Sequence, residues 1–214
     1  IELLRPAQAG CCGALRYHLN DHEGGLADAR RNIDAWWPLL QAGAEAIVLN
    51  ASGCGSQVKD YARLLADDPV YAERATQVSA LAYDVAEVLS RLEPELRARL
   101  DSQAVPQKLV FHPPCSLQHG QKIRGQVEGL LRMAGAELLP VGEAHLCCGS
   151  AGTYSVLQPQ LSTQLRERKL AQLEAGAPAL ILSANIGCIT HLAAGTERPV
   201  MHWIEWIEHR LQAE

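Results

Sequence analysis

A short apolar run that ends in a Gly-Cys pair, LILSANIGC at residues 180–188, decides the fold of this chain. An earlier run of the same kind, IVLNASGC at residues 47–54, repeats it, and a third, KLVFHPPC at residues 108–115, also ends in a cysteine. Short aliphatic runs of this kind predict buried β-strands. Each of these cysteines is therefore expected at, or just after, the carboxyl end of a strand.

The chain has two Cys-Cys-Gly triplets. The triplet at residues 11–13 precedes the run at 47–54, and the triplet at residues 147–149 precedes the run at 180–188. The segments around the triplets match in order, and the offset between the copies stays between 133 and 136 residues. A single repeat of this length indicates duplication of a whole domain rather than a solenoid. We therefore predict one domain over residues 1–95, a second over residues 108–214, and a junction over residues 96–107.

Strand-like runs alternate with helical segments in each copy, which predicts an α/β fold with mainly parallel sheets. The second copy has a strand and a helical stretch before its triplet, whereas only ten residues precede Cys11. We expect the first copy to be truncated at its amino terminus and to lack a strand that carries an eighth cysteine. Apolar residues recur in steps of three and four between residues 70 and 92, which predicts one continuous helix there.

The composition of the 214 residues limits the classes of function. Hydrophobic residues make up 48% of the chain, and the net charge is −5. The sequence has no stripe of basic residues, so nucleic acid is not expected as a partner. No apolar run approaches the roughly 20 residues that cross a bilayer. Cysteines paired with apolar strands, rather than with loop-rich sequence, predict a reducing, cytoplasmic compartment. The sequence has no phosphate-binding glycine motif, and no Ser-His-Asp order or pair of carboxylates strong enough to support hydrolysis. We therefore expect no catalytic residue in this chain.

All seven cysteines belong to the repeated pattern, which makes every one a candidate ligand of a metal centre. In the second copy we expect Cys115, Cys147, Cys148 and Cys188 each at or just after the carboxyl end of a strand. The carboxyl ends of parallel strands share one edge of a sheet, where ligand sites form. Adjacent thiolates suit a multinuclear iron–sulfur centre better than a single zinc ion, whose ligands are usually two to four residues apart. Zinc, a dithiol redox pair and purely structural cysteines remain as alternatives. The candidate ligands are Cys11, Cys12, Cys54, Cys115, Cys147, Cys148 and Cys188.

Glycines and histidines near the cysteines are candidates for a supporting role. Gly149, Gly152 and Gly187 allow positive φ angles, so that backbone N–H groups can point at sulfurs. His112 and His145 could ligate or hydrogen-bond a cluster, or only satisfy loop carbonyls.

The cysteine motifs resemble those of the cysteine-rich CCG domain family, which includes a cysteine-rich component of heterodisulfide reductase and the iron–sulfur subunits of glycolate, lactate and glycerol-3-phosphate oxidoreductases. The likeness extends to the carboxyl-terminal half of glycolate oxidase iron–sulfur subunits. The stretches that carry it are GCCG at 10–13, YHLN at 17–20, NIDAWWP at 32–38, SGC at 52–54, CSLQH at 115–119, HLCCGSAGTY at 145–154, ANIGC at 184–188 and HWIE at 202–205.

This resemblance implies a non-flavin subunit of an oxidoreductase complex, without a complete active site of its own. It would pass electrons from FAD, held only on flavin-containing glycolate oxidase subunits, through a [4Fe–4S] cluster toward quinone. A cytoplasmic location is expected, with peripheral contact with the inner face of the cytoplasmic membrane left open.

The chain departs from the broader family pattern at one position in each copy. The family pattern ends in Cys-x-x-Cys, but Ala51 and Asn185 replace its first cysteine here. This favours a four-thiolate cluster, or a cluster in only one copy, over the five-cysteine centre that cleaves a disulfide. The open alternatives are a zinc-binding or metal-free docking scaffold for the flavin subunit, and a heterodisulfide-reductase-like thiol–disulfide module.

Overall fold

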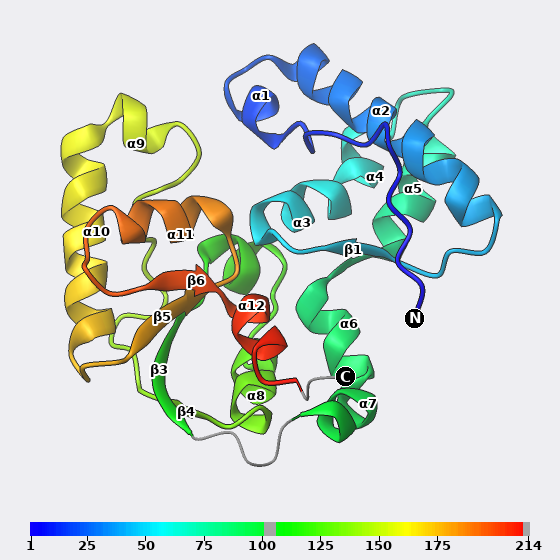
Figure 1. The fold of residues 1–214 in the computed structure, drawn as a ribbon. Helices are drawn as coiled ribbons and strands as arrows, with labels where there is room; N and C mark the ends of the chain where they lie inside the picture. The colour runs from blue at the N-terminus through cyan, green and yellow to red at the C-terminus, as the bar shows by residue number, and fades with distance from the viewer. Residues whose placement is uncertain (101–105, 212–214) are drawn as a thin grey trace. The chain divides into compact units, whose positions relative to one another are not determined.

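The protein, as a computed structural model, is described over residues 1–100 and 106–211 (Figure 1). The chain divides into two compact units, Ile1–Val85 and Ala86–Glu214. Within the described residues, no helix has the length and apolar character that crossing a membrane requires. The domain bounds expected from the sequence remain a prediction, and residues 101–105 of the expected junction lie outside the described residues.

The second unit is built on a four-stranded sheet in which every pairing is parallel. Its strands are β3 (Gln107–His112), β4 (Ala136–Leu138), β5 (Leu180–Ser183) and β6 (Val200–His202), in the order β4-β3-β5-β6. The central strands β3 and β5 are the apolar runs that the sequence singled out. Their buried side chains include Val110 and Ile181, both with no exposed surface. The predicted α/β class with parallel strands is confirmed.

Helices cover both faces of this sheet. From β3 the chain passes through α8 (Gln126–Met133) to β4, and then returns through α10 (Pro159–Glu174) to β5 on the other side of β3. The crossover from β3 to β4 and the crossover from β4 to β5 run in opposite directions across the sheet. Because both crossovers are right-handed, α8 lies on one face of the sheet and α10 on the other (Figure 1). The next crossover, α11 (Ile186–Ala193), lies on the same face as α10.

Shorter helices complete the second unit. The closing helix α12 (Trp203–Glu208) follows β6 and packs near α8, with Trp203 and Trp206 buried. The remaining ones are α6 (Val85–Arg91), α7 (Glu93–Arg99), η1 (Ser116–Gly120), a π-helical turn, and α9 (Tyr154–Leu157).

The first unit has a two-stranded parallel sheet, β1 (Ile47–Leu49) with β2 (Ala82–Asp84). Residues such as Ile33, Val58 and Tyr61 form its core, together with Cys12. Its helices are α1 (Ala14–His18), α2 (His22–Gln41), α3 (Ser52–Lys59), α4 (Tyr61–Leu64) and α5 (Ala72–Leu81).

The continuous helix expected between residues 70 and 92 is wrong. The helical pattern is interrupted at Ala82–Asp84, which leaves α5 and pairs with β1 as β2. Ala82 and Asp84 are both buried, so pairing with β1 hides them from water. The gain from this tertiary contact outweighs the local helical periodicity, which continues through the strand.

Candidate metal centre

The second unit has a topological switch point at the carboxyl edge of its sheet. Connections from β3 and β5 leave in opposite directions, because α8 and α11 lie on opposite faces. Such a reversal opens a ligand site between the two strand ends. The two strands end level with each other, since His112 pairs with Ser183 in the ladder. Cys115 and Cys188 follow these two residues closely along the chain.

Cys115 and Cys188 both stand where a helix begins. Cys115 precedes the first residue of η1, and Cys188 lies in the first turn of α11. Unpaired N–H groups at such ends favour negative charge. For Cys115 the Ser116 N–H acts in this direction, but the hydrogen bond with Cys147 and burial outweigh it and raise the pKa of Cys115. As the sequence predicted, these two cysteines follow the ends of apolar strands.

The triplet cysteines Cys147 and Cys148 reach the site by a different route. They lie on the loop between β4 and α9, well past the end of the strand at Leu138, so for them the expected position at a strand end is wrong. The loop is shaped by Gly149, whose φ is +95°. In this conformation the Gly149 N–H donates to the Sγ atom of Cys147 at 3.3 Å. This is the backbone-to-sulfur bond that the glycine pattern predicted.

Gly149 is held tightly against α10. A Cβ atom at this position would lie 2.5 Å from the backbone oxygen of Ser162, and the φ angle would be strained for any other residue. The hydroxyl of Ser162 donates to the Gly149 carbonyl at 2.9 Å and lies 3.2 Å from Nε2 of His191 on α11. Helices α10 and α11 therefore hold the turn at Gly149, which orients the two cysteines of the triplet. The sequence pattern did not mark Ser162 or His191.

The four thiols of the second unit form a chain of hydrogen bonds. Hydrogen bonds with Cys115 and Cys148, aided by the Gly149 N–H, hold the pKa of Cys147 far below its ordinary value. The same contacts raise the pKa of Cys115 and Cys148, and burial adds to this effect. A hydrogen bond with Cys148, together with the His112 imidazole, lowers the pKa of Cys188 to about 6. Cys147 and Cys188 are therefore the thiols that lose their protons most readily, and ligation of a metal requires such deprotonation.

His112, the last residue of β3, adds a nitrogen donor to this group. Its side chain is fully buried, and its potential ligand atom lies within 4.8 Å of those of Cys148 and Cys188. His145 behaves differently, because it is exposed and its carbonyl lies 3.2 Å from Nε2 of His119. Of the two histidines suggested by the sequence, the structure brings only His112 into the site.

The other predicted glycines have different roles. Gly152 has a φ of +61°, as expected. The expectation for Gly187 is wrong: it belongs to α11 and has no positive φ, and its N–H donates to Oδ1 of Asn185 at 2.9 Å. Asn185 stands where the family pattern has a cysteine, and its side chain caps the helix. Its amide also donates to the Ser116 hydroxyl at 3.3 Å.

One buried cation near the triplet was not found from the sequence. Lys169 on α10 is only 2% exposed, and its Nζ donates to the Glu143 carbonyl at 2.7 Å. Burial lowers the pKa of Lys169, while the negative charges of Cys148, Glu143 and Cys147 act in the opposite direction. No periodicity marks this residue, because the segment that contains it is a polar helix with little amphipathic character.

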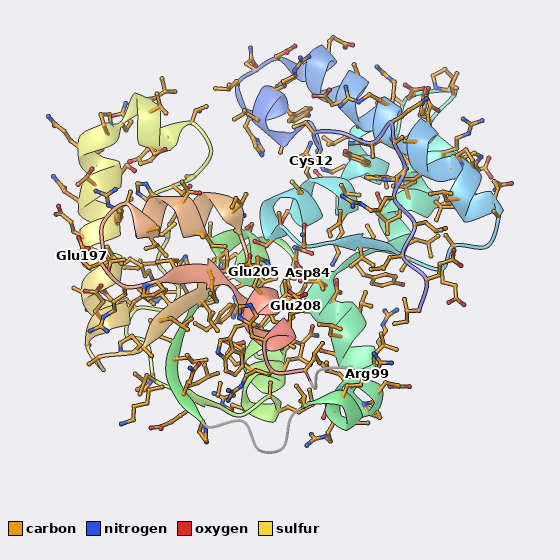
Figure 2. The ribbon with its side chains drawn as sticks, viewed as in Figure 1. Cys12, Asp84, Arg99, Glu197, Glu205 and Glu208 are labelled. Carbon is orange, nitrogen blue, oxygen red and sulfur yellow. The ribbon has the colours of Figure 1, made fainter. Side chains whose placement is uncertain are left out.

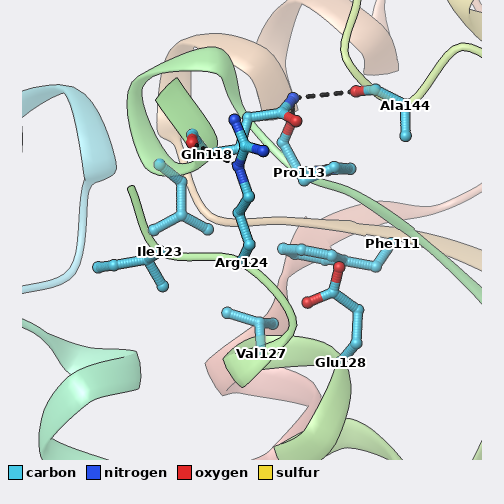
Figure 3. Close-up of a pocket in the computed structure, with 9 residues that line it drawn as sticks. Phe111, Pro113, Gln118, Ile123, Arg124, Val127, Glu128 and Ala144 are labelled. Carbon is cyan, nitrogen blue, oxygen red and sulfur yellow. Dashed lines mark hydrogen bonds between the residues drawn. The ribbon is translucent and has the colours of Figure 1, made fainter. Parts of the chain in front are cut away.

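A pocket of about 140 Å³ lies beneath η1 and is lined by Phe111, Gln118 and Arg124 among others (Figure 3). The amide of Gln118 donates to the carbonyls of Pro113 and Ala144 at 3.0 and 2.9 Å. These two bonds tie the loop that carries Cys115 to the loop that leads to the triplet.

The first unit repeats part of this site with three cysteines. Cys12 is buried on the loop that leads into α1 (Figure 2), Cys54 lies in the first turn of α3, and Cys11 is exposed. A hydrogen bond between the thiols raises the pKa of Cys12, and the same bond lowers that of Cys54 to about 7. Ala51, at the position of the missing cysteine, precedes α3 just as Asn185 precedes α11.

The backbone of the first triplet is clamped by two buried side chains. Asn32 on α2 accepts from the Gly10 N–H and donates to the Cys11 carbonyl, both at 2.8 Å. Tyr61 donates its hydroxyl to the Cys12 carbonyl at 2.8 Å. Neither residue was predicted as part of the site, although Asn32 belongs to one of the stretches that carried the family resemblance.

The triplet glycine of the first unit packs as its counterpart does in the second. Gly13 has a φ of +83°, and a Cβ atom there would lie 2.5 Å from the carbonyl oxygen of Gly25 on α2. In each unit, therefore, a left-handed glycine sits against the backbone of the following long helix. The recurrence explains why the triplet ends in glycine both times.

Comparison with known proteins places these motifs in a wider group. A family model described as a cysteine-rich domain, CCG, matches residues 1–59 and again residues 109–193. The two matches agree with the duplication seen in the sequence.

Individual relatives match over nearly the whole chain. The "Glycolate oxidase iron-sulfur subunit" of Escherichia coli (strain K12) is 52% identical over 100% of this chain and 52% of its own length. The "Probable glycolate oxidase iron-sulfur subunit" of Bacillus subtilis (strain 168) is 32% identical over 92% of this chain and 44% of its own length. "Lactate utilization protein A" of Shouchella clausii (strain KSM-K16) is 28% identical, covering 90% and 78%. This chain thus spans about half the length of the first two.

Proposed function

Because this chain belongs to the CCG cysteine-rich domain family, we propose that it is the cluster-binding part of an iron–sulfur subunit of a 2-hydroxy-acid oxidase. The names of two relatives, which contain "glycolate oxidase iron-sulfur subunit", support the proposal, and so does the name of the third, which refers to lactate utilization.

The observation that carries the proposal is the convergence of four thiols at the carboxyl edge of one sheet. Cys147 and Cys148 arrive from one loop, and Cys115 and Cys188 arrive from the ends of two neighbouring strands. Their thiols are already linked by hydrogen bonds. Four cysteine thiolates form the usual ligand set of a four-iron centre, and adjacent cysteines can bind different irons of it. The donor set therefore fits an iron–sulfur centre.

An iron–sulfur centre, when bound, accepts and releases single electrons. The residues of this chain would hold it and set its energy. The thiolates are the ligands, the Gly149 N–H supports the sulfur of Cys147, and the buried ammonium of Lys169 provides positive charge nearby. Hydrogen bonds, burial and net charge are the means by which proteins adjust such potentials.

The finer parts of the proposal concern the whole complex. We propose a [4Fe–4S] centre held by Cys115, Cys147, Cys148 and Cys188, with FAD bound by a separate flavin-containing subunit that oxidises glycolate or a similar acid. Electrons would then pass through this chain toward quinone. Cys11, Cys12 and Cys54 are proposed as ligands of a second site in the first unit, where only three thiols belong to the described residues.

A zinc site is the second candidate, and one observation favours it. His112, Cys148 and Cys188 place their ligand atoms within 4.8 Å of one another, which suits a single ion. Two thiolates and an imidazole are a common part of structural zinc sites. In this case the chain would act as a docking scaffold for the flavin subunit and would carry no electrons.

Metal analysis separates the two candidates. The natural full-length polypeptide would be purified without oxygen and assayed for iron, acid-labile sulfide and zinc, with an EPR spectrum after reduction. The proposal predicts about four irons and four sulfides per occupied site. Cys147→Ser and Cys148→Ser should lose this centre while the flavin partner still oxidises its substrate. Zinc without sulfide, or an unchanged cluster spectrum in both variants, would rule the proposal out.

A further inference from the structure

His112 lies beside the thiols of Cys148 and Cys188, and its side chain has no evident structural task. It ends β3 beside Ser183, whose hydroxyl donates to the His112 carbonyl at 3.1 Å. The backbone of His112 is therefore bonded on this side. Its imidazole, with no exposed surface, is packed inside the unit.

The imidazole is unusual among the histidines near the site. Neither of its ring nitrogens has a nitrogen or oxygen hydrogen-bond partner among the described residues. By contrast, the ring of His119 lies 3.2 Å from the His145 carbonyl, and that of His191 lies 3.2 Å from the Ser162 hydroxyl. A buried polar group without a partner costs free energy and calls for a functional explanation.

The polar atoms within reach of His112 are sulfurs. The Sγ atoms of Cys148 and Cys188 and the potential ligand atom of His112 lie within 4.8 Å of one another. A neutral imidazole carries one N–H group, and a metal-bound thiolate accepts hydrogen bonds. The four cysteines already match the four irons of the proposed centre, so no iron remains for the imidazole to ligate.

We propose that His112 donates an N–H···S hydrogen bond to a cysteine ligand of the centre, Cys188 or Cys148, and thereby raises the reduction potential of the centre. This inference rests on the proposed function. Reduction by one electron adds negative charge to the ligand sulfurs, which strengthens the hydrogen bond, so the bond stabilises the reduced state. The proton stays on the imidazole throughout, and no bond is made or broken. His112 is therefore a positioning and tuning residue.

The test measures the reduction potential of the loaded, full-length protein in three variants. In His112→Leu the N–H donor is removed, and the centre should keep its iron and sulfide but titrate at a more negative potential. In His112→Gln an amide donor remains, so the potential should return toward the wild-type value. His119→Gln alters an exposed imidazole near Cys115 and should leave the potential unchanged.

A second measurement needs no variant and therefore does not depend on the folding of any. Pulsed EPR of wild-type protein labelled with ¹⁵N-histidine should show a weak nitrogen coupling, as expected across a hydrogen bond. A strong coupling would mean direct ligation and would overturn the inference, as would the absence of any coupling.

The outcomes also separate this inference from the proposed function. A wild-type protein that holds a centre, together with a His112→Leu variant that has the same potential, would reject the role of His112 alone. A wild-type protein without iron or sulfide would reject the proposed function, and this inference with it.

Discussion

The hydroxyl of Tyr61 donates a hydrogen bond to the carbonyl oxygen of Cys12 at 2.8 Å, and both residues are buried. The bond joins a helix of the first unit to its cysteine triplet. Together with the two bonds from Asn32, it fixes the backbone of the triplet from outside. The backbone that carries these thiols is therefore held by contacts within the protein.

This bond leads to the first prediction. Tyr61→Phe removes the hydroxyl and leaves the buried Cys12 carbonyl without this donor, so the free energy of unfolding should fall by about 1 to 2 kcal/mol. Tyr71→Phe is the matched control, because its hydroxyl bonds to Asp34 in an exposed place. The control should lose less than about 0.5 kcal/mol. Denaturant unfolding measures both, and equal losses would contradict the role given to Tyr61.

The triplet glycine gives a second prediction. Gly149→Ala would bring a Cβ atom within 2.5 Å of the Ser162 carbonyl in a left-handed conformation. Gly152→Ala is also left-handed, but its Cβ would have no atom within 4 Å, so only the backbone strain of about 1 to 2 kcal/mol applies. We expect Gly149→Ala to be the more destabilised, or not to fold, as judged by circular dichroism during denaturation. A smaller loss in Gly149→Ala than in Gly152→Ala would contradict the packing argument.

Lys169 provides a third prediction, which rests on the proposed centre. Lys169→Met keeps much of the side-chain volume but removes the buried positive charge. Because the charge favours the more negative, reduced state, the centre of this variant should titrate at a lower potential. Arg168→Gln is the control: Arg168 is exposed and pairs with Glu143, so water screens its charge. A redox titration in which the two variants shift equally would show that burial of Lys169 is unimportant.

Asp68 allows a prediction about pH. Its carboxylate accepts the N–H groups of Val70 and Tyr71 and pairs with Arg30, and these bonds hold the pKa of Asp68 below its ordinary value. A carboxyl whose pKa is lowered by folding stabilises the protein above its unfolded pKa, about 3.9, and this stabilisation is lost as the pH falls through the lower, folded pKa. Wild type should thus be more stable than Asp68→Asn near neutral pH, and the gap should shrink below about pH 4.

The control for this experiment is Asp67→Asn, which removes the same formal charge from an exposed neighbour. Unfolding followed from pH 7 to pH 3 gives the comparison. If the gap between wild type and Asp68→Asn stays constant over this range, the bonds to Asp68 do not stabilise its charged form.

Two elements show how far local patterns reach. The aliphatic runs before Cys54 and Cys188 fold as the strands β1 and β5, because branched aliphatic residues favour an extended, paired chain. In contrast, Ala82–Asp84 continues a helical periodicity and yet becomes β2, because its register with β1 exists only after the chain has folded. Local propensity cannot contain information about a partner strand far away in the sequence.

Some residues of the candidate site could be recognised from the sequence, and others only from the structure. The seven cysteines were evident from the sequence, since duplication repeats them in register. Asn185 illustrates what a substitution alone leaves open: its sequence position shows only that a cysteine is missing, whereas the structure shows a helix cap. Likewise, Ser162 and Lys169 belong to a long polar helix whose composition does not distinguish them from surface residues.

The sequence by itself determined that this protein has an α/β fold with duplicated cysteine motifs, because strand patterning and motif spacing are local properties of the chain. Only the tertiary structure decided which groups meet. The connections that leave β3 and β5 run in opposite directions, and four thiols meet at the carboxyl edge of the sheet, where the same packing buries His112 among them. Burial and proximity between distant residues arise when helices and strands pack, and it is these two properties that give His112 and Lys169 their proposed roles.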